Sequence, residues 1–327
     1  MNNLVMYSKT NATWSKHIAA WNLLKEFRGN MFETNWIMNV EQAREFVIWA
    51  LHVKKLKHST VKSYLYSIKL AHTLNNQNCP NYNGDEIIKM MFKGADNISL
   101  IENPGVRDRY TMTMNTLLIL GHRIASSDWK IHSKQVVWTV FLTSFFSSCR
   151  MGELVAPTEK TFDPSTTLLW KHVVITDSYV NIFIPFTKTK GLKGHLIEVF
   201  PFEMKNCCPY TALKGWETYA KKTGFYEKNH PVFTFESGKF LTTNKLNDIL
   251  KTLLSDLGGK GKASFTCHSF RAAIPTLIAL HPDKSYVADI KEWGEWDSPA
   301  YTRYLKLEHD RKKYLFSKIA VLLCKSV

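Results

Sequence analysis

A single short block of strand-like sequence lies between long stretches of helical periodicity, and this contrast limits the possible folds more than any other feature. Within residues 168–200, the runs LLWKHVVI, YVNIFIPF and HLIEVF are rich in β-branched and aromatic residues. Polar turns separate them, the first at Asp177 and Ser178. Three neighbouring runs of this kind predict a small antiparallel sheet. We therefore expect a mainly α fold with a small antiparallel β-sheet (α+β).

Apolar residues three or four positions apart predict helices on both sides of this sheet. The pattern is helical from Trp14 to about Leu74, and residues 59–74 give the clearest segment, with Ser59 or Thr60 as its cap. Its apolar stripe consists of Val61, Tyr64, Leu65, Ile68 and Ala71. Later helices are expected at residues 112–124, 134–147, 210–222, 243–257, 268–280 and 286–293, and after the Ser298-Pro299 pair.

The length of 327 residues predicts two domains. A polar, turn-rich segment at residues 75–84 precedes a second break at Asn103, Pro104 and Gly105. We place the boundary at this second break. The expected domains are residues 1–104, which are helical, and residues 105–327, which are mostly helical and contain the sheet.

The composition excludes several classes of protein. No segment has the roughly 18 uninterrupted apolar residues that a membrane span requires, and residues 1–16 lack the zones of a signal peptide. Six cysteines show no CxxC spacing, which favours reduced thiols in an intracellular protein that is not secreted. The GGKGKAS segment lacks complete P-loop spacing, and the histidines lack metal-ligand spacing. Neither a nucleotide cofactor nor a metal is expected.

The formal net charge of +15 favours a polyanionic partner. Five lysines lie before or on the helix predicted at residues 59–74, and they are candidates for contact with the phosphates of DNA: Lys54, Lys55, Lys57, Lys62 and Lys69. A solvated lysine face is the alternative interpretation.

Four separated motifs contain residues suited to chemistry at a phosphate. Arg150 closes an apolar helix in SSCRMGEL, where Glu153 can pair with it, and a structural ion pair is the alternative. CHSFR places His268 and Arg271 one helical turn apart, on a shared face. The loop FTKTKGLKG holds Lys188 and Lys190 between two strands, and EWGEWDSPAYTRYLK holds Trp296 and Tyr304.

In this order and at these intervals, the motifs resemble the catalytic set of the tyrosine recombinases, the lambda-integrase and Cre-like family. The resemblance rests on an arginine in RxGEL, a lysine on a β-hairpin, HxxR, a histidine or tryptophan after a glycine-containing turn, and a tyrosine eight or nine residues later. HSTVKSYLYSIKLAHT is similar to the helical core-binding domain that precedes the family's catalytic domain. HSFRAA and GEWDSPAYTRYLK resemble the eukaryotic mobile-element recombinases of Crypton and DIRS-like type.

The resemblance implies a role for each residue. Tyr304 would be the nucleophile that forms a 3′-phosphotyrosine, and the interval from Trp296 favours it over Tyr301. Arg150 and Arg271 would hold the scissile phosphate, while Glu153 orients Arg150. His268 would assist loss of the phenol proton, and the hairpin lysine would protonate the 5′ oxygen. Lys188 is favoured for this last role, with Lys190 as its rival and as a DNA contact. Trp296, favoured over Trp293, would contact the phosphate.

The resemblance also implies site-specific recombination of double-stranded DNA for mobile-element integration or excision. The active form would be a tetramer on two duplexes, with a dimer at each site and no cofactor. The compartment would be the nucleus in a eukaryote and the cytoplasm or nucleoid in a bacterium. Two alternatives stay open: a type IB topoisomerase, and a domesticated DNA-binding protein without activity.

Overall fold

The computed structural model describes residues 8, 11–29, 37–102, 110–188, 190–201, 203–257 and 265–280. The chain divides into two compact units, Met1–Val106 and Arg107–Val327. We describe each unit separately. Among the described residues, no helix combines the length and the apolar character needed to cross a membrane.

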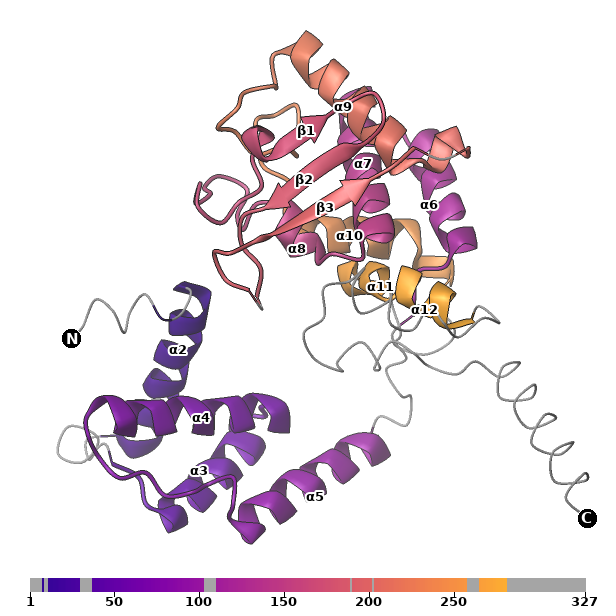
Figure 1. The fold of residues 1–327 in the computed structure, drawn as a ribbon. Helices are drawn as coiled ribbons and strands as arrows, with labels where there is room; N and C mark the ends of the chain where they lie inside the picture. Colours follow the sequence, from indigo (N-terminus) through magenta and orange to yellow (C-terminus); the bar gives the residue numbers. More distant parts are fainter. Residues whose placement is uncertain are drawn as a thin grey trace, which may run out of the picture. The chain divides into compact units, whose positions relative to one another are not determined.

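Unit 1 is helical (Figure 1). Its helices are α2 (Asn11–Arg28), α3 (Val40–His52), α4 (His58–Leu74) and α5 (Glu86–Glu102). Their buried faces form one core, whose members include Leu24, Phe46, Val47, Leu65, Ile68 and Ile88. Helix α5 was not predicted, although its first half packs on α3 and α4.

The start of α4 differs from the expectation. The helix begins at His58, its N-cap is Lys57, and no side chain caps it, so the predicted capping by Ser59 or Thr60 is wrong. The expected apolar stripe is nevertheless correct in register, because Val61, Leu65 and Ile68 are all buried. The stripe faces the core, which leaves the opposite side of α4 exposed.

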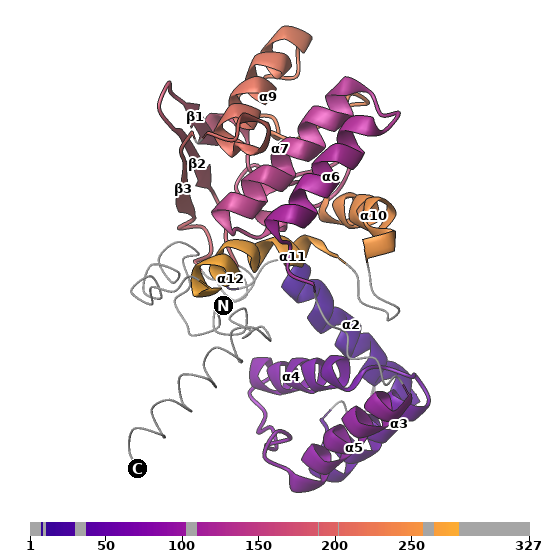
Figure 2. The same ribbon diagram turned by 90° about the vertical axis from the view of Figure 1, so that its right-hand side faces the viewer.

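Unit 2 is built around α7 (Ile131–Ser147), which is buried along most of its length. The helix contacts α6 (Met114–Ser126), α9 (Pro209–Thr223), the short α8 (Met151–Leu154) and strand β3. Figure 2 shows the sheet and α9 on one side of α7, with α6 and then α10 (Thr243–Leu253) on the other. This central position explains why α7 lacks the polar face of a surface helix.

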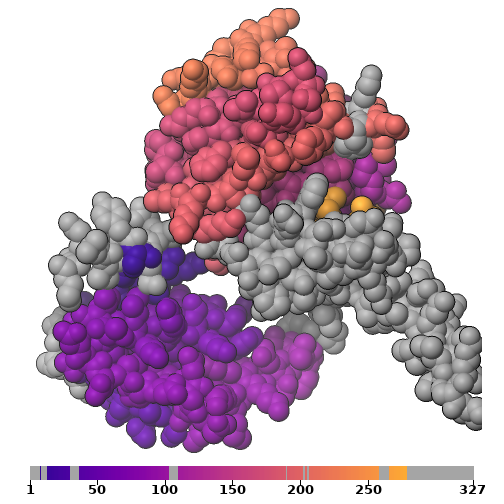
Figure 3. Space-filling view, in the orientation of Figure 1, coloured from indigo at the N-terminus to yellow at the C-terminus, as the bar shows by residue number. Residues whose placement is uncertain are grey.

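The sheet is antiparallel with strand order β1-β2-β3, as the sequence predicts. The strands are β1 (Val173–Ile175), β2 (Val180–Ile184) and β3 (His195–Val199). Strand β1 is shorter than expected because Trp170–His172 form a 3₁₀ turn, called η2. The register pairs Val173 with Ile182 and Ile182 with Ile197, and these side chains face the core. The strand region forms part of the surface in Figure 3.

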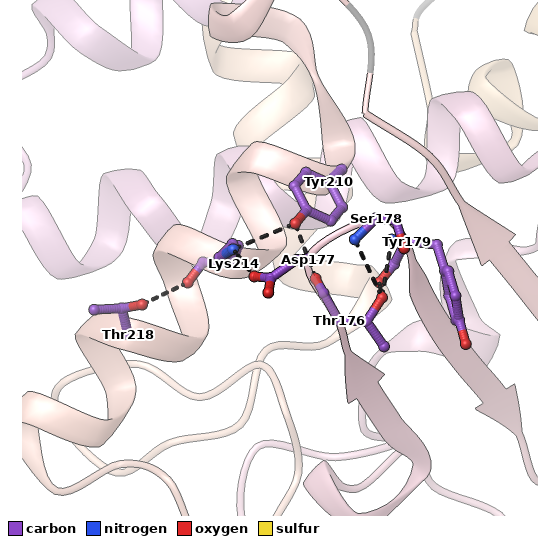
Figure 4. A network of polar contacts seen from close by, with 7 residues as sticks. All are labelled: Thr176, Asp177, Ser178, Tyr179, Tyr210, Lys214 and Thr218. Atoms are coloured by element: carbon purple, nitrogen blue, oxygen red, sulfur yellow. Dashed lines mark hydrogen bonds and ion pairs between the residues drawn. The ribbon is translucent and has the colours of Figure 1, made fainter.

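The turn between β1 and β2 is fastened to α9 by a network of polar contacts (Figure 4). The hydroxyl of Tyr210 donates to the carbonyl of Thr176 at 2.9 Å, and Lys214 Nζ lies 3.0 Å from a carboxylate oxygen of Asp177. The hydroxyl of Thr176 accepts from the backbone N–H groups of Ser178 and Tyr179. These bonds fix the sheet on the helical layer.

The helix predicted at residues 268–280 is two helices, α11 (Cys267–Arg271) and α12 (Ala273–Leu280). Pro275 explains the break. In one continuous helix its ring would meet the carbonyl of Arg271, four residues earlier, whereas proline is tolerated in the first turn of α12. Arg271 is therefore the last residue of a short helix.

Candidate functional site

The first part of the site is the turn that leads from α7 to Arg150. Helix α7 ends at Ser147, and Ser148 has φ 52°, in the left-handed region. The Cys149 N–H donates to the hydroxyl of Ser147 at 3.3 Å, and the Cys149 carbonyl accepts from the hydroxyl of Ser144 at 3.4 Å. Side chains of the last turn of α7 therefore fix the peptide that precedes Arg150.

Arg150 forms the predicted contact with Glu153. One carboxylate oxygen of Glu153 accepts from the Arg150 backbone N–H at 2.9 Å, and the other lies 2.8 Å from Arg150 Nη1. The Glu153 side chain is only 8% exposed, while that of Arg150 is 32% exposed. The carboxylate thus holds both the backbone and the guanidinium of Arg150, whose side chain still reaches the surface.

Helix α11 carries His268 and Arg271 and is anchored at several points. Thr266 caps it by accepting from the His268 N–H at 3.3 Å. The side-chain carbonyl of Asn247, on α10, accepts from the Cys267 N–H at 2.8 Å. The ring of Phe270 stacks on Phe141 of α7, with ring centroids 5.1 Å apart. These contacts fix α11 against the core of unit 2.

One hydrogen bond joins the two arginine motifs across 123 residues of sequence. Nη1 of Arg271 donates to the carbonyl of Ser148 at 2.9 Å. Arg271 is 4% exposed, whereas His268 is exposed, so the two side chains of HxxR are not presented equally. The fold thus brings Arg271 to the turn that carries Arg150, and it places His268 on the same short helix.

Burial dominates the electrostatics of this turn. The Cys149 thiol is fully buried, and its pKa is raised to about 12, first by burial and then by the negative charge of Glu153. Cys267, immediately before His268, also has a pKa raised to about 12 by burial. Both thiols are therefore protonated near neutral pH and act as packing groups.

The loop between β2 and β3 carries Lys188 and Lys190. A pair of backbone hydrogen bonds between Thr187 and Gly191, at 3.1 and 2.9 Å, closes its tip. Gly191 has φ 60°, which suits glycine in so tight a turn. Lys188 is exposed and Lys190 is half-buried. Figures 1 and 2 show this loop at the end of unit 2 where α11 lies.

The five candidate lysines of unit 1 are not equivalent. Lys54 forms an ion pair with Glu26, and its ammonium lies 5.4 Å from the centroid of the Trp49 ring. Lys55, Lys57, Lys62 and Lys69 are exposed, and Lys62 and Lys69 lie two helical turns apart on the outer side of α4. Lys54 therefore has a structural role that the sequence did not predict.

Several predicted site residues lie outside the described residues, namely Trp293, Trp296, Tyr301 and Tyr304, and so does the helix expected at residues 286–293.

Sequence reasoning also missed part of the site. Ser144, Ser147 and Ser148 build the turn before Arg150, and only the polar SSC run after an apolar helix could have indicated them. Within the described ranges, no group of three histidine, cysteine or acidic side chains could hold a metal ion.

Comparison with known proteins links this architecture to one family of folds. No protein-family model and no curated protein matches the sequence. Among solved structures, a lambda integrase fragment, a dimer bound to a COC' core site, is similar at a TM-score of 0.57 and 10% identity, over 93% of this chain and 91% of that one.

Two further structures are similar. The XerH site-specific recombinase bound to palindromic difH substrate, in a post-cleavage complex, gives a TM-score of 0.56 and 16% identity over 87% of this chain and 72% of that one. The Tn1549 transposon integrase in complex with circular intermediate DNA gives 0.52 and 11% over 91% and 98%. At these identities the likeness defines the fold, and this chain has the fold of the tyrosine recombinases.

Proposed function

We propose that this chain, with its tyrosine-recombinase fold, is a site-specific recombinase that cuts and rejoins double-stranded DNA through a 3′-phosphotyrosine. One observation carries the proposal. The bond from Arg271 to the Ser148 carbonyl brings the RMGE and HSFR motifs to one turn, although 123 residues separate the bonded pair. If the ion pair between Arg150 and Glu153 were purely structural, a second, buried arginine would not be required at the same turn.

The two arginines suit the charge that develops when a phosphodiester is attacked. Negative charge spreads over the nonbridging oxygens in the transition state, and planar guanidinium groups bind such oxygens through paired N–H donors. In our proposal Arg150, oriented by Glu153, and Arg271 bind these oxygens. Removal of either guanidinium should lower the cleavage rate on the order of 10²-fold or more, as the loss of a transition-state donor does.

Bond making and breaking follow from the remaining residues. The phenol oxygen of Tyr304 forms a bond to phosphorus while the bond to the 5′ oxygen breaks, and His268 assists removal of the phenol proton. Lys188, or Lys190 as the alternative, donates a proton to the departing 5′ oxygen, and Trp296 donates its indole N–H to the phosphate. The phosphotyrosine keeps the energy of the phosphodiester, so rejoining requires only the reverse reaction.

The biological setting belongs to the same proposal. The similar folds include a transposon integrase and a dimer on a core site, which supports integration or excision of a mobile element by a dimer at each site. In our proposal two such dimers form a tetramer on two duplexes. We propose a Crypton or DIRS-like origin because the segments HSFRAA and GEWDSPAYTRYLK resemble those recombinases. The nucleus is then the compartment, and the bacterial cytoplasm or nucleoid is the alternative.

A covalent trap tests the chemistry. The full chain is mixed with a library of duplexes that carry a randomised core and a nick near each possible cleavage position, so that the short cleaved fragment is lost and rejoining is blocked. Wild type and Tyr301→Phe should form DNA adducts that survive denaturation, whereas Tyr304→Phe should form none. Sequencing of the joined DNA then identifies the site.

Three outcomes would contradict parts of the proposal. Equal trapping by both tyrosine variants would exclude Tyr304 as the nucleophile. No adduct with wild type would favour a DNA-binding protein without activity. Efficient relaxation of supercoiled plasmids that lack the recovered site would favour a type IB topoisomerase.

A further inference from the structure

We propose that Ser148 is a positioning residue, and that its left-handed backbone conformation holds Arg271 in register with Arg150. The inference rests on the proposed function for its catalytic consequence. Serine rarely adopts φ 52°, because the side chain then crowds the neighbouring peptide groups. A non-glycine residue in this region is retained only where the surrounding structure over-determines it.

The surroundings of Ser148 identify what holds it there. From the Ser148 carbonyl to the Arg150 carbonyl, every backbone polar group has a partner. The Ser148 carbonyl accepts from Arg271. The Cys149 N–H donates to the Ser147 hydroxyl, and the Cys149 carbonyl accepts from the Ser144 hydroxyl. The Arg150 N–H donates to the Glu153 carboxylate, and the Arg150 carbonyl accepts from the Glu153 N–H. The left-handed turn directs the Ser148 carbonyl at Arg271, and two residues later the same turn delivers Arg150.

The side chain of Ser148 does not account for its position. Its hydroxyl is buried and, among the described residues, has no hydrogen-bond partner. Within these residues the hydroxyl makes no bond that would fix the turn, and the backbone carbonyl is the group that contacts Arg271. The contribution of Ser148 is therefore its carbonyl and the direction in which the turn points it.

A pair of variants separates the backbone from the hydroxyl. Ser148→Gly and Ser148→Ala both lack the hydroxyl, but only glycine adopts the left-handed region without cost. With the nicked duplex recovered above at saturating concentration, Ser148→Gly should form the covalent adduct within twofold of the wild-type rate. Ser148→Ala keeps a Cβ, as serine does, and should stay within about threefold of the wild-type rate, whereas the β-branched Ser148→Val should be at least tenfold slower, with little change in DNA affinity for any of them.

A matched control lies in unit 1. Asn76 also has a left-handed φ, 54°, and belongs to unit 1, whereas every predicted catalytic residue belongs to unit 2. Asn76→Val should lower the thermal midpoint without changing the rate of adduct formation. Equal slowing by Ser148→Gly and Ser148→Ala would assign the effect to the hydroxyl and overturn the proposal, as would a wild-type rate in Ser148→Val.

A second measurement does not depend on activity and separates the two proposals. Thermal midpoints are compared for Ser148→Gly and Ser148→Ala, each with Arg271 intact and with Arg271→Met. If Arg271 holds the turn, the difference in thermal midpoint between the Ser148→Gly and Ser148→Ala variants should be smaller in the chain that also carries Arg271→Met, because the turn can then relax. An unchanged difference would overturn the inference even if wild type traps DNA. A smaller difference would support it even if wild type traps none.

Discussion

At the residue scale, the site depends on side chains that fix the backbone of other residues. The Glu153 carboxylate accepts hydrogen bonds from both the Arg150 N–H and the Arg150 guanidinium, and Arg271 donates a hydrogen bond to the Ser148 carbonyl. These bonds fix positions that surface charge pairs leave variable, since exposed ion pairs contribute little and move easily. The two buried groups, Glu153 and Arg271, are consequently the most sensitive points of the described site.

Glu153→Gln tests this sensitivity. The amide keeps the shape of the carboxylate, but its NH₂ group takes the place of one of the two acceptor oxygens. This donor then faces another donor, either the Arg150 N–H or the Arg150 guanidinium. We expect the free energy of unfolding to fall by about 1–3 kcal/mol. Urea unfolding of the full chain measures it. Asp248→Asn is the control, because Asp248 pairs with Lys251 at the same spacing but is exposed, and its loss should stay under about 1 kcal/mol. Equal losses would mean that Glu153 is an ordinary surface partner.

A buried histidine in unit 1 gives a pH-dependent stability. His72 Nε2 accepts from the Met38 N–H at 3.3 Å, and Nδ1 lies 3.1 Å from the Asn78 carbonyl, so the folded state favours the neutral ring. Burial lowers the pKa of His72 below its usual 6.5. As the pH falls through about 6.5, the unfolded chain takes up the proton first, and the folded state loses stability.

Hydrogen exchange of α4 peptides from the full chain measures this effect. Exchange should quicken between pH 7.5 and pH 5.5, after correction for the intrinsic rate. His72→Gln should flatten the dependence, whereas His122→Gln, which changes an exposed histidine of unit 2, should leave it as in wild type. A dependence that persists in His72→Gln would assign the titration to another group.

At the scale of elements, close packing around α7 fixes this helix and therefore the turn from Ser147 to Arg150 that follows it. Helix α6 approaches α7 at Gly121, where an added Cβ would lie 2.8 Å from the Trp138 ring. The indole N–H of Trp138 donates to the Asn206 carbonyl at 3.2 Å, which limits how far the ring can shift. Gly121 is therefore required by packing, even though glycine is a poor helix former.

Two glycine substitutions in helices should accordingly have opposite signs. Gly121→Ala should lower the free energy of unfolding by about 1 kcal/mol, because the clash outweighs the gain in helix propensity. Gly215 lies in the exposed middle of α9, where the added carbon meets no described atom within 4 Å apart from the helix's own backbone and the two chain neighbours. Gly215→Ala should therefore raise the free energy of unfolding by about 0.5–1 kcal/mol. Thermal unfolding of both variants provides the comparison. Stabilisation by Gly121→Ala would show that Trp138 moves freely.

At the scale of the whole molecule, the net charge of +15 favours DNA binding, but individual lysines should contribute unequally. A lysine that neutralises a DNA phosphate releases a counterion, and it adds about 0.9 to the slope of log affinity against log salt concentration. Lys62 and Lys69 are exposed on α4, whereas Lys54 is paired with Glu26.

The double variant Lys62→Gln/Lys69→Gln should therefore reduce the salt slope by about 2, from about 0.9 for each lysine. Lys54→Gln should change it by much less than one. Fluorescence anisotropy with a labelled duplex over a series of salt concentrations gives the slopes. A large change for Lys54→Gln would mean that its pair with Glu26 opens on DNA. No change for the double variant would remove α4 from the DNA interface.

The sequence by itself determined the fold class, the three-stranded sheet, most of the described helices and the set of motifs, because each depends on residues a few positions apart, whereas α5 was missed. The stripe of Val61, Leu65 and Ile68 and the turn at Asp177 are correct for this reason. The break before α12 was also encoded locally, by Pro275, although our prediction missed it.

Only the tertiary structure decided which distant groups meet. The bond from Arg271 to Ser148 spans 123 residues, and no local pattern predicts the left-handed turn that makes it possible. The pairing of Lys54 with Glu26 likewise depends on how helices pack. Periodicity specifies which face of an element is apolar, but the partner of that face is set by close packing of the whole unit.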